Sequence, residues 1–345
     1  MTDAGQQKQA YKNIVLRESA NAYGPIVEFL AKNHSYEVYN LGKKAESIRS
    51  KVSYGISLVW QTVRLFAVRK RLRDCDTIFS VGYVTIPLKL FARLGLFNYR
   101  KCFWFGFFVH STRWDAIFRL QRLLDTEKDH YILLTEFEVE LYANRFGIRR
   151  DCLHYFPYGH WDLTDESSSI PPAGVTPFQY YFSGGYSNRD YVPLIEIFRK
   201  LDVPLVVICS RLNTEIDSIP LPSNVTVLRD VSLPKFRSYL RHSKACIIPL
   251  KEDTGISGVS VILQAMRFGR LIIVSDMGVI RGYVENGKSG YVLKDFKTEL
   301  PPILANIEKH PDLASRFGEE ARSQFEARFS RTVGSVALWK ILERN

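Results

Sequence analysis

The sequence contains no run of about 18 apolar residues, which is the length that a helix needs to cross a bilayer. Its first residues, MTDAGQQKQAYKN, are polar, so we expect no secretory signal there. Only five of the 345 residues are cysteine, at scattered positions and without a CxxC pair. These absences argue against a membrane-spanning or disulfide-stabilised protein and favour a reduced, cytoplasmic one.

Several motifs with well-understood site chemistry are also missing. The sequence has no GxGxxG of nicotinamide-binding folds, no GxxxxGK[ST] phosphate loop and no GxSxG of serine hydrolases. No group of histidines and cysteines has the spacing of a zinc site, so we expect no metal. Residues 74–76 have the letters of a metal-binding DxD motif, but they directly precede an expected strand, and we interpret them as a turn.

Positive charge is abundant but unevenly distributed. The formal net charge is +11, and residues 1–150 hold 24 Lys and Arg against 14 Asp and Glu, whereas residues 151–345 hold 23 against 22. This asymmetry predicts an anionic surface or ligand for the first half, with nucleic acid and an anionic membrane as candidates. Because the sequence has no RNP, KH or zinc signature, we expect no nucleic-acid partner.

Short apolar runs alternate with helix-like stretches along the whole chain. Examples of the strand-like runs are 13–17 and 77–81 in the first half, and 203–210 and 271–275 in the second. This alternation predicts an α/β fold with parallel sheets, and the length predicts two domains. Residues 162–177 are polar and rich in Pro and Ser, so we place a linker there, between a first domain at 1–161 and a second at 178–325.

The stretch 47–73 has helically spaced apolar residues and a strongly basic second half. One interpretation is a core-packed helix with a solvated basic end, and the other is an amphipathic helix on anionic lipid. The aromatic residues Phe97, Trp104, Phe107 and Trp114 are either core or a continuation of the same membrane-facing patch. The residues of this membrane or acceptor surface would be Trp60, Arg64, Arg69, Lys70, Arg71, Arg73 and Trp104.

Two strand–glycine–helix junctions stand out in the second half. The loop 254–258 (TGISG) leads into an expected helix at 259–268, which Gly269 would end, before a buried strand at 271–275. Free backbone N–H groups at such a helix start favour an anion, so we hypothesise a diphosphate site. A similar junction at 184–190 carries Arg189, which could pair with a phosphate oxygen.

Residues 245–293 resemble the nucleotide-binding signature of GT-B glycosyltransferases of the large retaining family 4. Residues 263–269 (LQAMRFG) match its L-E-A-M-A-x-G, and residues 286–293 (NGKSGYVL) match its later glycine turn. A diffuse resemblance extends over 131–159, 182–194 and the end of the chain. It implies a GT-B fold, in which two Rossmann-like domains face a cleft and a C-terminal helix, 326–345, crosses back to the first domain.

The resemblance also implies roles for individual residues. Gln264 would bind the ribose hydroxyls, since an amide can accept from a hydroxyl. Arg189 and His110 would be catalytic: Arg189 would neutralise the departing diphosphate, and His110 would face the donor sugar. The implied donor-binding residues are Gly184, Gly185, Asn188, Arg189, Asp253, Ser257, Gly258, Val259, Ser260 and Gln264.

The function implied by this resemblance is sugar transfer from a UDP-sugar, or less favourably a GDP-sugar, to a hydroxyl group. The basic first half suggests a lipid-linked or saccharide acceptor in cell-envelope polysaccharide synthesis. The protein would be peripheral to the inner face of the plasma membrane and would need no cofactor besides the nucleotide-sugar. Because Ile256 and Gln264 replace two motif glutamates, a non-catalytic nucleotide-sugar-binding subunit and a GT-B epimerase stay open as alternatives.

Overall fold

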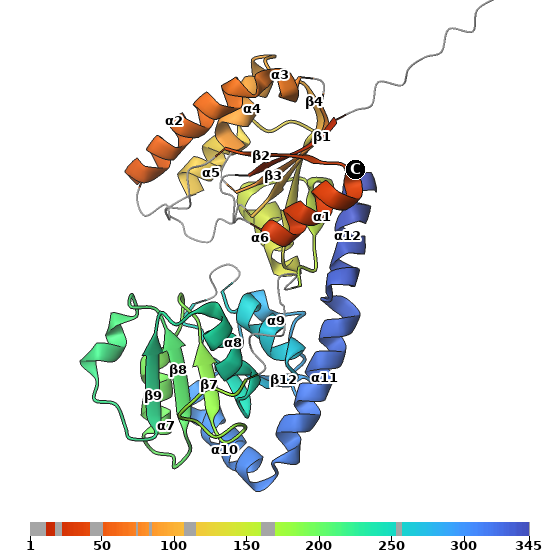
Figure 1. Cartoon of the computed structure of the whole chain (residues 1–345). Coiled ribbons are helices and arrows are strands. Elements are labelled where there is room, and N and C mark those ends of the chain that lie inside the picture. The colour runs from red at the N-terminus through yellow and green to blue at the C-terminus, as the bar shows by residue number, and fades with distance from the viewer. Residues whose placement is uncertain are drawn as a thin grey trace, which may run out of the picture. The chain divides into compact units, whose positions relative to one another are not determined.

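A computed structural model describes residues 12–17, 23–41, 51–73, 75–82, 85–106, 115–159, 170–252 and 257–344. The chain divides into two compact units (Figure 1). Unit 1 comprises Met1–Leu133, Val139–Phe156 and Leu338–Asn345, and unit 2 comprises Leu134–Glu138 and Pro157–Ala337. Each unit has its own six-stranded parallel sheet, which confirms the expected α/β fold class. Of the expected linker, residues 162–169 lie outside the described residues.

Unit 1 is built on a sheet with the strand order β2-β1-β3-β4-β5-β6. Its strands are β1 (Lys12–Arg17), β2 (Glu37–Asn40), β3 (Cys75–Val81), β4 (Tyr99–Phe105), β5 (Asp129–Leu133) and β6 (Leu153–Tyr155). The connecting helices are α1 (Gly24–His34), α2 (Lys51–Ala67), α3 (Arg69–Leu72), α4 (Thr85–Arg93), α5 (Asp115–Arg122), α6 (Glu136–Phe146) and the 3-10 turn η2 (Arg150–Cys152).

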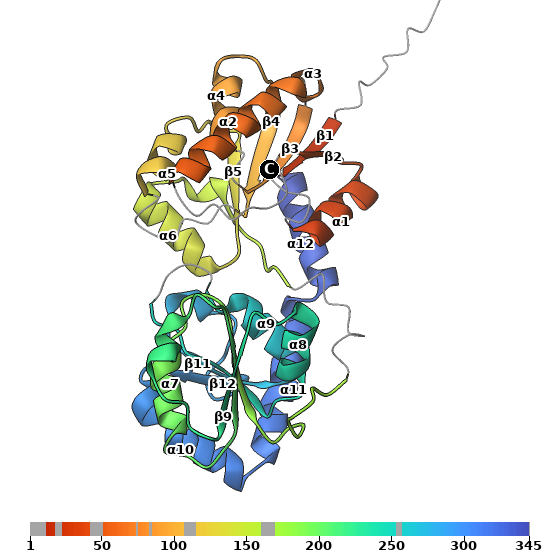
Figure 2. The same cartoon turned by 60° about the vertical axis from the view of Figure 1, so that its left-hand side comes forward.

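Unit 2 repeats the plan with the strand order β12-β11-β10-β7-β8-β9. Its strands are β7 (Tyr181–Gly184), β8 (Leu205–Cys209), β9 (Val225–Arg229), β10 (Ala245–Ile248), β11 (Leu271–Ser275) and β12 (Gly290–Leu293). Its helices are α7 (Tyr191–Phe198), α8 (Leu233–Arg241), α9 (Val259–Arg267), α10 (Phe296–Lys309) and α11 (Asp312–Arg328), with the 3-10 turns η4 (Thr214–Ser218) and η5 (Gly278–Ile280). Helices α8, α9 and α11 cover one face, and α7 and α10 cover the other (Figure 2).

Three expectations about elements need correction. The single helix expected at 47–73 is α2 followed by α3, because the backbone of Val68 leaves the helical range, with ψ of 7°. The C-terminal helix expected at 326–345 is shorter, because α11 continues to Arg328 and α12 spans Arg331–Arg344. Asp76 lies within β3 rather than in a turn, since the ladder to β4 already begins at Cys75. No helix among the described residues has the length and apolar character to cross a membrane.

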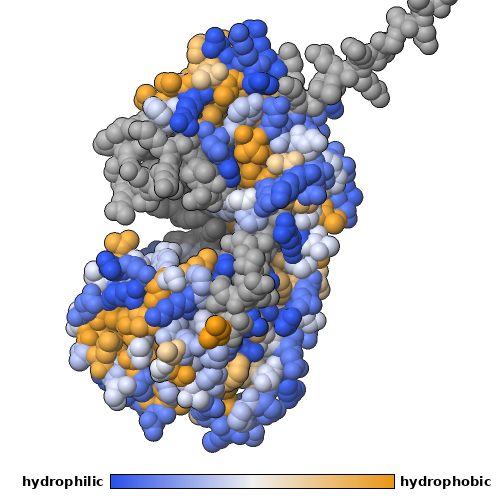
Figure 3. Space-filling view, in the orientation of Figure 1, coloured by the Kyte–Doolittle hydropathy of each residue, from blue (hydrophilic) through white to orange (hydrophobic). Residues whose placement is uncertain are grey.

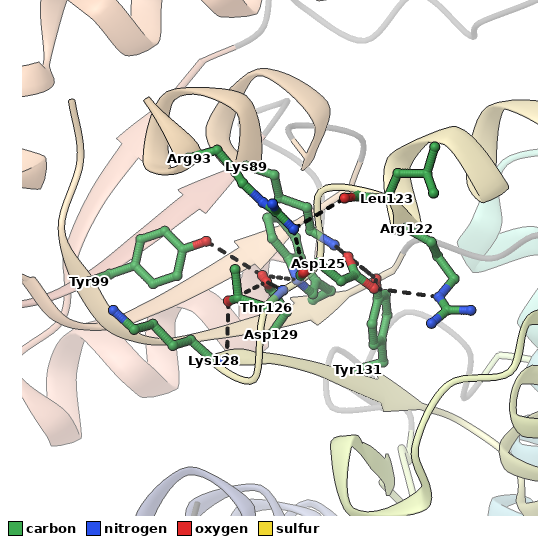
Figure 4. Close-up of polar contacts among 11 residues, drawn as sticks. Lys89, Arg93, Tyr99, Arg122, Leu123, Asp125, Thr126, Lys128, Asp129 and Tyr131 are labelled. Atoms are coloured by element: carbon green, nitrogen blue, oxygen red, sulfur yellow. Dashed lines mark hydrogen bonds and ion pairs between the residues drawn. The ribbon is translucent and has the colours of Figure 1, made fainter. Parts of the chain in front are cut away.

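The core of unit 1 contains a buried ionic cluster that attaches α4 to the sheet (Figure 4). The side chain of Lys89 is fully buried, forms an ion pair with Asp125 and donates a hydrogen bond of 2.8 Å to the Tyr131 hydroxyl. Its ammonium also lies 4.7 Å from the ring centre of Trp104. The Trp104 indole in turn donates to buried Asp129 at 3.0 Å. The inner face of α4 is therefore held by charge as well as by apolar packing.

Two histidines on neighbouring strands of unit 1 share a hydrogen bond. Nδ1 of His130 and Nε2 of His154 lie 3.0 Å apart, and the Phe103 ring stacks on His130. Burial, followed by the proximity of His130, lowers the pKa of His154 to about 4. Burial also lowers the pKa of His130. The pair is therefore neutral in the folded protein at neutral pH.

We predict that replacing Lys89 by Met lowers the free energy of unfolding by about 1–3 kcal/mol, because Asp125 loses its buried partner and keeps only Arg122 at 3.6 Å and the Tyr131 hydroxyl. Chemical denaturation followed by circular dichroism measures this change. The double variant Lys89→Met/Asp125→Asn should be more stable than the single variant. Equal stability of wild type and single variant would show that the cluster does not hold α4.

We predict that the His130–His154 pair makes the fold acid-sensitive. The pKa of His154 is below its unfolded value of 6.5 in the folded state, so its stabilising effect is complete above that pH and is lost as the pH falls toward 4. The expected loss is about 3 kcal/mol. Asp151 and Asp129 act on the pair with Lys101 and Arg149, so the reference must be a His154→Gln variant titrated identically. Parallel pH profiles for the two proteins would contradict the prediction.

Candidate functional site

The two glycine junctions expected from the sequence meet at the switch point of the second sheet. Strands β7 and β10 are neighbours there, with β8 and β9 added on one side and β11 and β12 on the other. The loops that follow β7 and β10 therefore leave the same edge of the sheet, at the position where open α/β sheets bind ligands. The sequence predicted only that each junction suits a phosphate. The sheet topology adds that the two junctions, about 65 residues apart in the sequence, lie at the same place.

Asn188 joins these two loops through its side chain. Its Nδ2 donates to the Glu252 carbonyl at 2.7 Å, and its Oδ1 accepts from the Glu252 N–H at 3.1 Å. The Asp190 N–H donates to the Pro249 carbonyl at 3.0 Å, close to this pair. The φ of Asn188 is 54°, a left-handed conformation that asparagine tolerates better than most residues. Asn188 therefore positions the loops, and both polar atoms of its amide are engaged in doing so.

Arg189 places a buried positive charge beneath the first loop. The residue is only 3% exposed, and its guanidinium donates to the carbonyls of Gly184 at 3.2 Å and Ser187 at 2.9 Å. Burial lowers the pKa of Arg189. In the part of the chain that the structure describes, no carboxylate forms an ion pair with it.

Two glycines make room for this arrangement. A Cβ on Gly185 would lie 2.6 Å from Nη2 of Arg189, and the φ of Gly185 is 137°. A Cβ on Gly184 would lie 2.6 Å from the rings of Phe182 and Phe236. Both positions therefore require glycine, and the loop backbone lies directly against the guanidinium.

The second loop ends at the start of α9, where the N-cap residue is a glycine and has no side chain to cap the helix. Gly258 occupies the N-cap with φ of 94°, and its carbonyl accepts the first helical bonds from Val261 and Ile262 at 3.0 and 2.9 Å. Glycine has no side-chain oxygen for the N–H groups of the first turn, which favours an anion at this position. Val259 has a buried side chain and can contribute only its backbone, whereas Ser257 is half-buried. Gly269 ends α9 with φ of 63°, as predicted.

Gln264 lies one helical turn further along α9 and is 3% exposed. Its Nε2 donates to the Ser260 carbonyl at 3.1 Å, and its Oε1 accepts from Nε of Arg237 on α8 at 3.4 Å. Arg237 is 5% exposed and was missed by the sequence reasoning. It lies near Lys235 and Arg241, two further basic residues of α8, and no local pattern marks it as the inward one.

The structure places the remaining predicted residues as follows. His110, Asp253 and Ile256 lie outside the described residues. Trp60 is 38% exposed, and Arg69, Lys70, Arg71 and Arg73 are all exposed. Trp104 is 1% exposed, so its expected place on the membrane or acceptor surface is wrong. It belongs to the core because its indole N–H is engaged by the buried carboxylate of Asp129.

Comparison with known families agrees with this geometry. Residues 183–324 match the family model of glycosyl transferases group 1. The match covers part of the chain and lies within unit 2. It includes both glycine loops, Arg189, Asn188 and the start of α9, which are the features that the switch point brings together. A search of curated protein sequences found no match.

Solved structures share the fold over nearly the whole chain. A sucrose-phosphate synthase from Thermosynechococcus elongatus is 14% identical, with a TM-score of 0.74 over 96% of this chain and 98% of that one. HepE from Anabaena, in complex with UDP and glucose, is 12% identical, with a TM-score of 0.73 over 97% and 100%. The lipopolysaccharide outer core galactosyltransferase WaaB, in its apo form, is 10% identical, with a TM-score of 0.59 over 96% and 99%. The α/β fold of this chain is that of the GT-B glycosyltransferases.

We predict that an Asn188→Gly variant releases the second loop without disturbing the sheet. Glycine tolerates the left-handed backbone, so only the side-chain bridge to Glu252 is removed. The Glu252 amide should exchange with solvent at least about tenfold faster, which corresponds to about 1.4 kcal/mol. The Leu250 amide, which donates to Ser275 Oγ at 2.8 Å, is the internal control and should be unchanged. Equal acceleration at both amides would contradict a local bridge.

Proposed function

We propose that the protein is a glycosyltransferase that moves a sugar from a UDP-sugar to a hydroxyl group. The observation that carries this proposal is the meeting of two glycine loops beside a buried arginine and a helix start that has glycine at its N-cap. This combination presents positive charge and backbone N–H groups to one location, as a diphosphate requires. The match to glycosyl transferases group 1 supports the reaction class. The match of residues 263–269 further supports a relationship to retaining family 4.

In this proposal, catalysis is mainly electrostatic and positional. Arg189 and the N–H groups at the start of α9 stabilise the negative charge that develops on the leaving nucleotide. Gly184 and Gly185 allow the backbone to approach the phosphates, with Asp253 and Ser257 also near the donor. Oε1 of Gln264 accepts a hydrogen bond from a ribose hydroxyl through the lone pair that Arg237 does not use. His110 orients the donor sugar.

The related structures support the choice of donor and the kind of acceptor. HepE was solved with UDP and with UDP-glucose, which favours UDP over GDP here. WaaB is named for the lipopolysaccharide outer core, and the basic first half suits an anionic membrane surface. We therefore propose a lipid-linked or saccharide acceptor in cell-envelope synthesis, at the inner face of the plasma membrane.

A ligand panel tests the donor site. We predict that UDP and UDP-sugars raise the melting temperature more than GDP and its sugars, because binding stabilises the folded state by mass action. Arg189→Met should weaken UDP binding about 10- to 100-fold, the range expected for losing a charge-assisted contact. Arg189→Lys should be intermediate.

The matched control for this panel is Arg270→Met. Arg270 is also a largely buried arginine whose pKa burial lowers, but it bonds the Phe268 and Ser243 carbonyls at the start of β11, the opposite edge of the sheet. Its loss should leave UDP affinity unchanged. Equal UDP affinity of wild type and Arg189→Met would contradict the proposed role of Arg189.

A non-catalytic nucleotide-sugar-binding subunit is the second candidate, since Ile256 and Gln264 replace two motif glutamates. Release of UDP in the presence of a lipid extract, with transfer of labelled sugar to it, distinguishes the candidates. UDP binding without release would favour the subunit. Conversion of one UDP-sugar into another without acceptor would instead identify an epimerase.

A further inference from the structure

Two helices of unit 1 present a row of exposed apolar side chains. On α2, Val59, Val63 and Phe66 follow at helical spacing, and on α4 and just after it are Leu90, Leu94 and Leu96. We call these six residues the apolar ridge. Each is between 38% and 66% exposed. The spacing i, i+4, i+7 places the three α2 residues on one side of the helix.

The two helices that carry the ridge pack against each other. Phe66 of α2 contacts Phe91 of α4 with ring centres 6.4 Å apart, and Phe91 contacts Phe97 at 5.4 Å. The space-filling view shows hydrophobic residues gathered over this part of unit 1 (Figure 3). A gathered, exposed apolar surface with a polar rim is typical of an interaction site.

The ridge cannot turn inward, because the other faces of both helices are already committed to the core. Leu65 of α2 and Leu88 of α4 are fully buried. Lys89, next to Leu90, is held by Asp125 and Tyr131 (Figure 4). Rotating α4 to hide Leu90 would therefore pull the Lys89 ammonium away from its buried carboxylate.

Exposed cations flank the ridge. Arg69 lies over the Phe66 ring at 4.3 Å and donates to the Phe66 carbonyl at 3.0 Å. These basic residues, called the basic rim here, are Arg69, Lys70, Arg71, Arg73 and Arg93. Within the described ranges, no member of the rim forms an ion pair with a carboxylate. Arg69 and Arg93 donate to backbone carbonyls, which are neutral and leave the positive charge of these side chains uncompensated.

We propose that the apolar ridge inserts into the headgroup–acyl boundary of an anionic bilayer while the basic rim binds lipid phosphates. Apolar residues that are exposed beside arginine and lysine fit a lipid surface, which offers both acyl chains and negative charge. This proposal rests on the proposed function, because it names the surface by which that enzyme contacts the membrane. It adds the α4 leucines, absent from the sequence-based surface, and makes insertion depend on apolar contact as well as charge.

Vesicle sedimentation of the full chain tests the proposal. The wild type should bind vesicles of phosphatidylglycerol and phosphatidylcholine, and part of this binding should persist at high salt, because apolar contacts are not screened. Leu90→Gln/Leu94→Gln should lower the vesicle affinity at least about tenfold at both low and high salt. A variant with Gln at Arg69, Lys70, Arg71 and Arg73 should lose mainly the salt-sensitive part.

The control is Ile170→Gln/Leu221→Gln, which changes two exposed apolar residues of unit 2, 74% and 46% exposed. It should bind vesicles like wild type. All variants should keep the UDP-induced shift in melting temperature, which shows that they are folded. Vesicle binding by a wild type that fails to bind UDP would overturn the proposed donor site and leave the ridge standing.

Two results would overturn the ridge proposal. One is unchanged vesicle binding by the Leu90→Gln/Leu94→Gln variant. The other is a wild-type dimer in light scattering that this variant converts to a monomer without loss of vesicle binding, which would assign the ridge to a second copy of the chain.

Discussion

The buried charge of Arg189 is the constraint on which the carboxyl edge of the second sheet depends. A guanidinium that is removed from water must be hydrogen-bonded, and here the carbonyls of Gly184 and Ser187 provide its bonds. This arrangement requires the backbone to pass directly over the arginine, which only glycine at 185 allows. The neighbouring Asn188 then bonds the backbone of the second loop. The geometry of these two loops thus follows from one buried cation and the residues that accommodate it.

Unit 1 also contains a buried cation, Lys89, but this cation stabilises packing and does not face a ligand site. Lys89 is paired with Asp125, and the surrounding hydroxyl and indole groups complete the network. Separating a buried ion pair is costly, so the pair fixes the local arrangement, and its charge is already neutralised toward a ligand. Arg189 has no such carboxylate among the described residues, and its partners are neutral carbonyls. A buried cation therefore supports packing in unit 1, whereas in unit 2 it favours anion binding.

The proposed division of labour follows from these two cations. In unit 2, the buried charge of Arg189 and a helix start with glycine at its N-cap lie at the switch point, where we propose that a nucleotide diphosphate is held. In unit 1, the Lys89 cluster keeps the inner face of α4 on the sheet, and so keeps Leu90 and Leu94 on the outside. An enzyme with a soluble donor and a membrane-bound acceptor needs both properties, each on a separate surface.

The sequence by itself determined the alternation of strands and helices, the positions of α9 and β11, the role of Gly269 and the two glycine junctions. These features depend on local periodicity and backbone preference, which neighbouring residues express directly. Only the tertiary structure decided that Trp104 is core, that Arg237 reaches Gln264 and that Asn188 joins loops about 65 residues apart. The exposure and the partners of such side chains depend on which distant segments the sheet order brings together. The local sequence of one strand or helix does not determine that order.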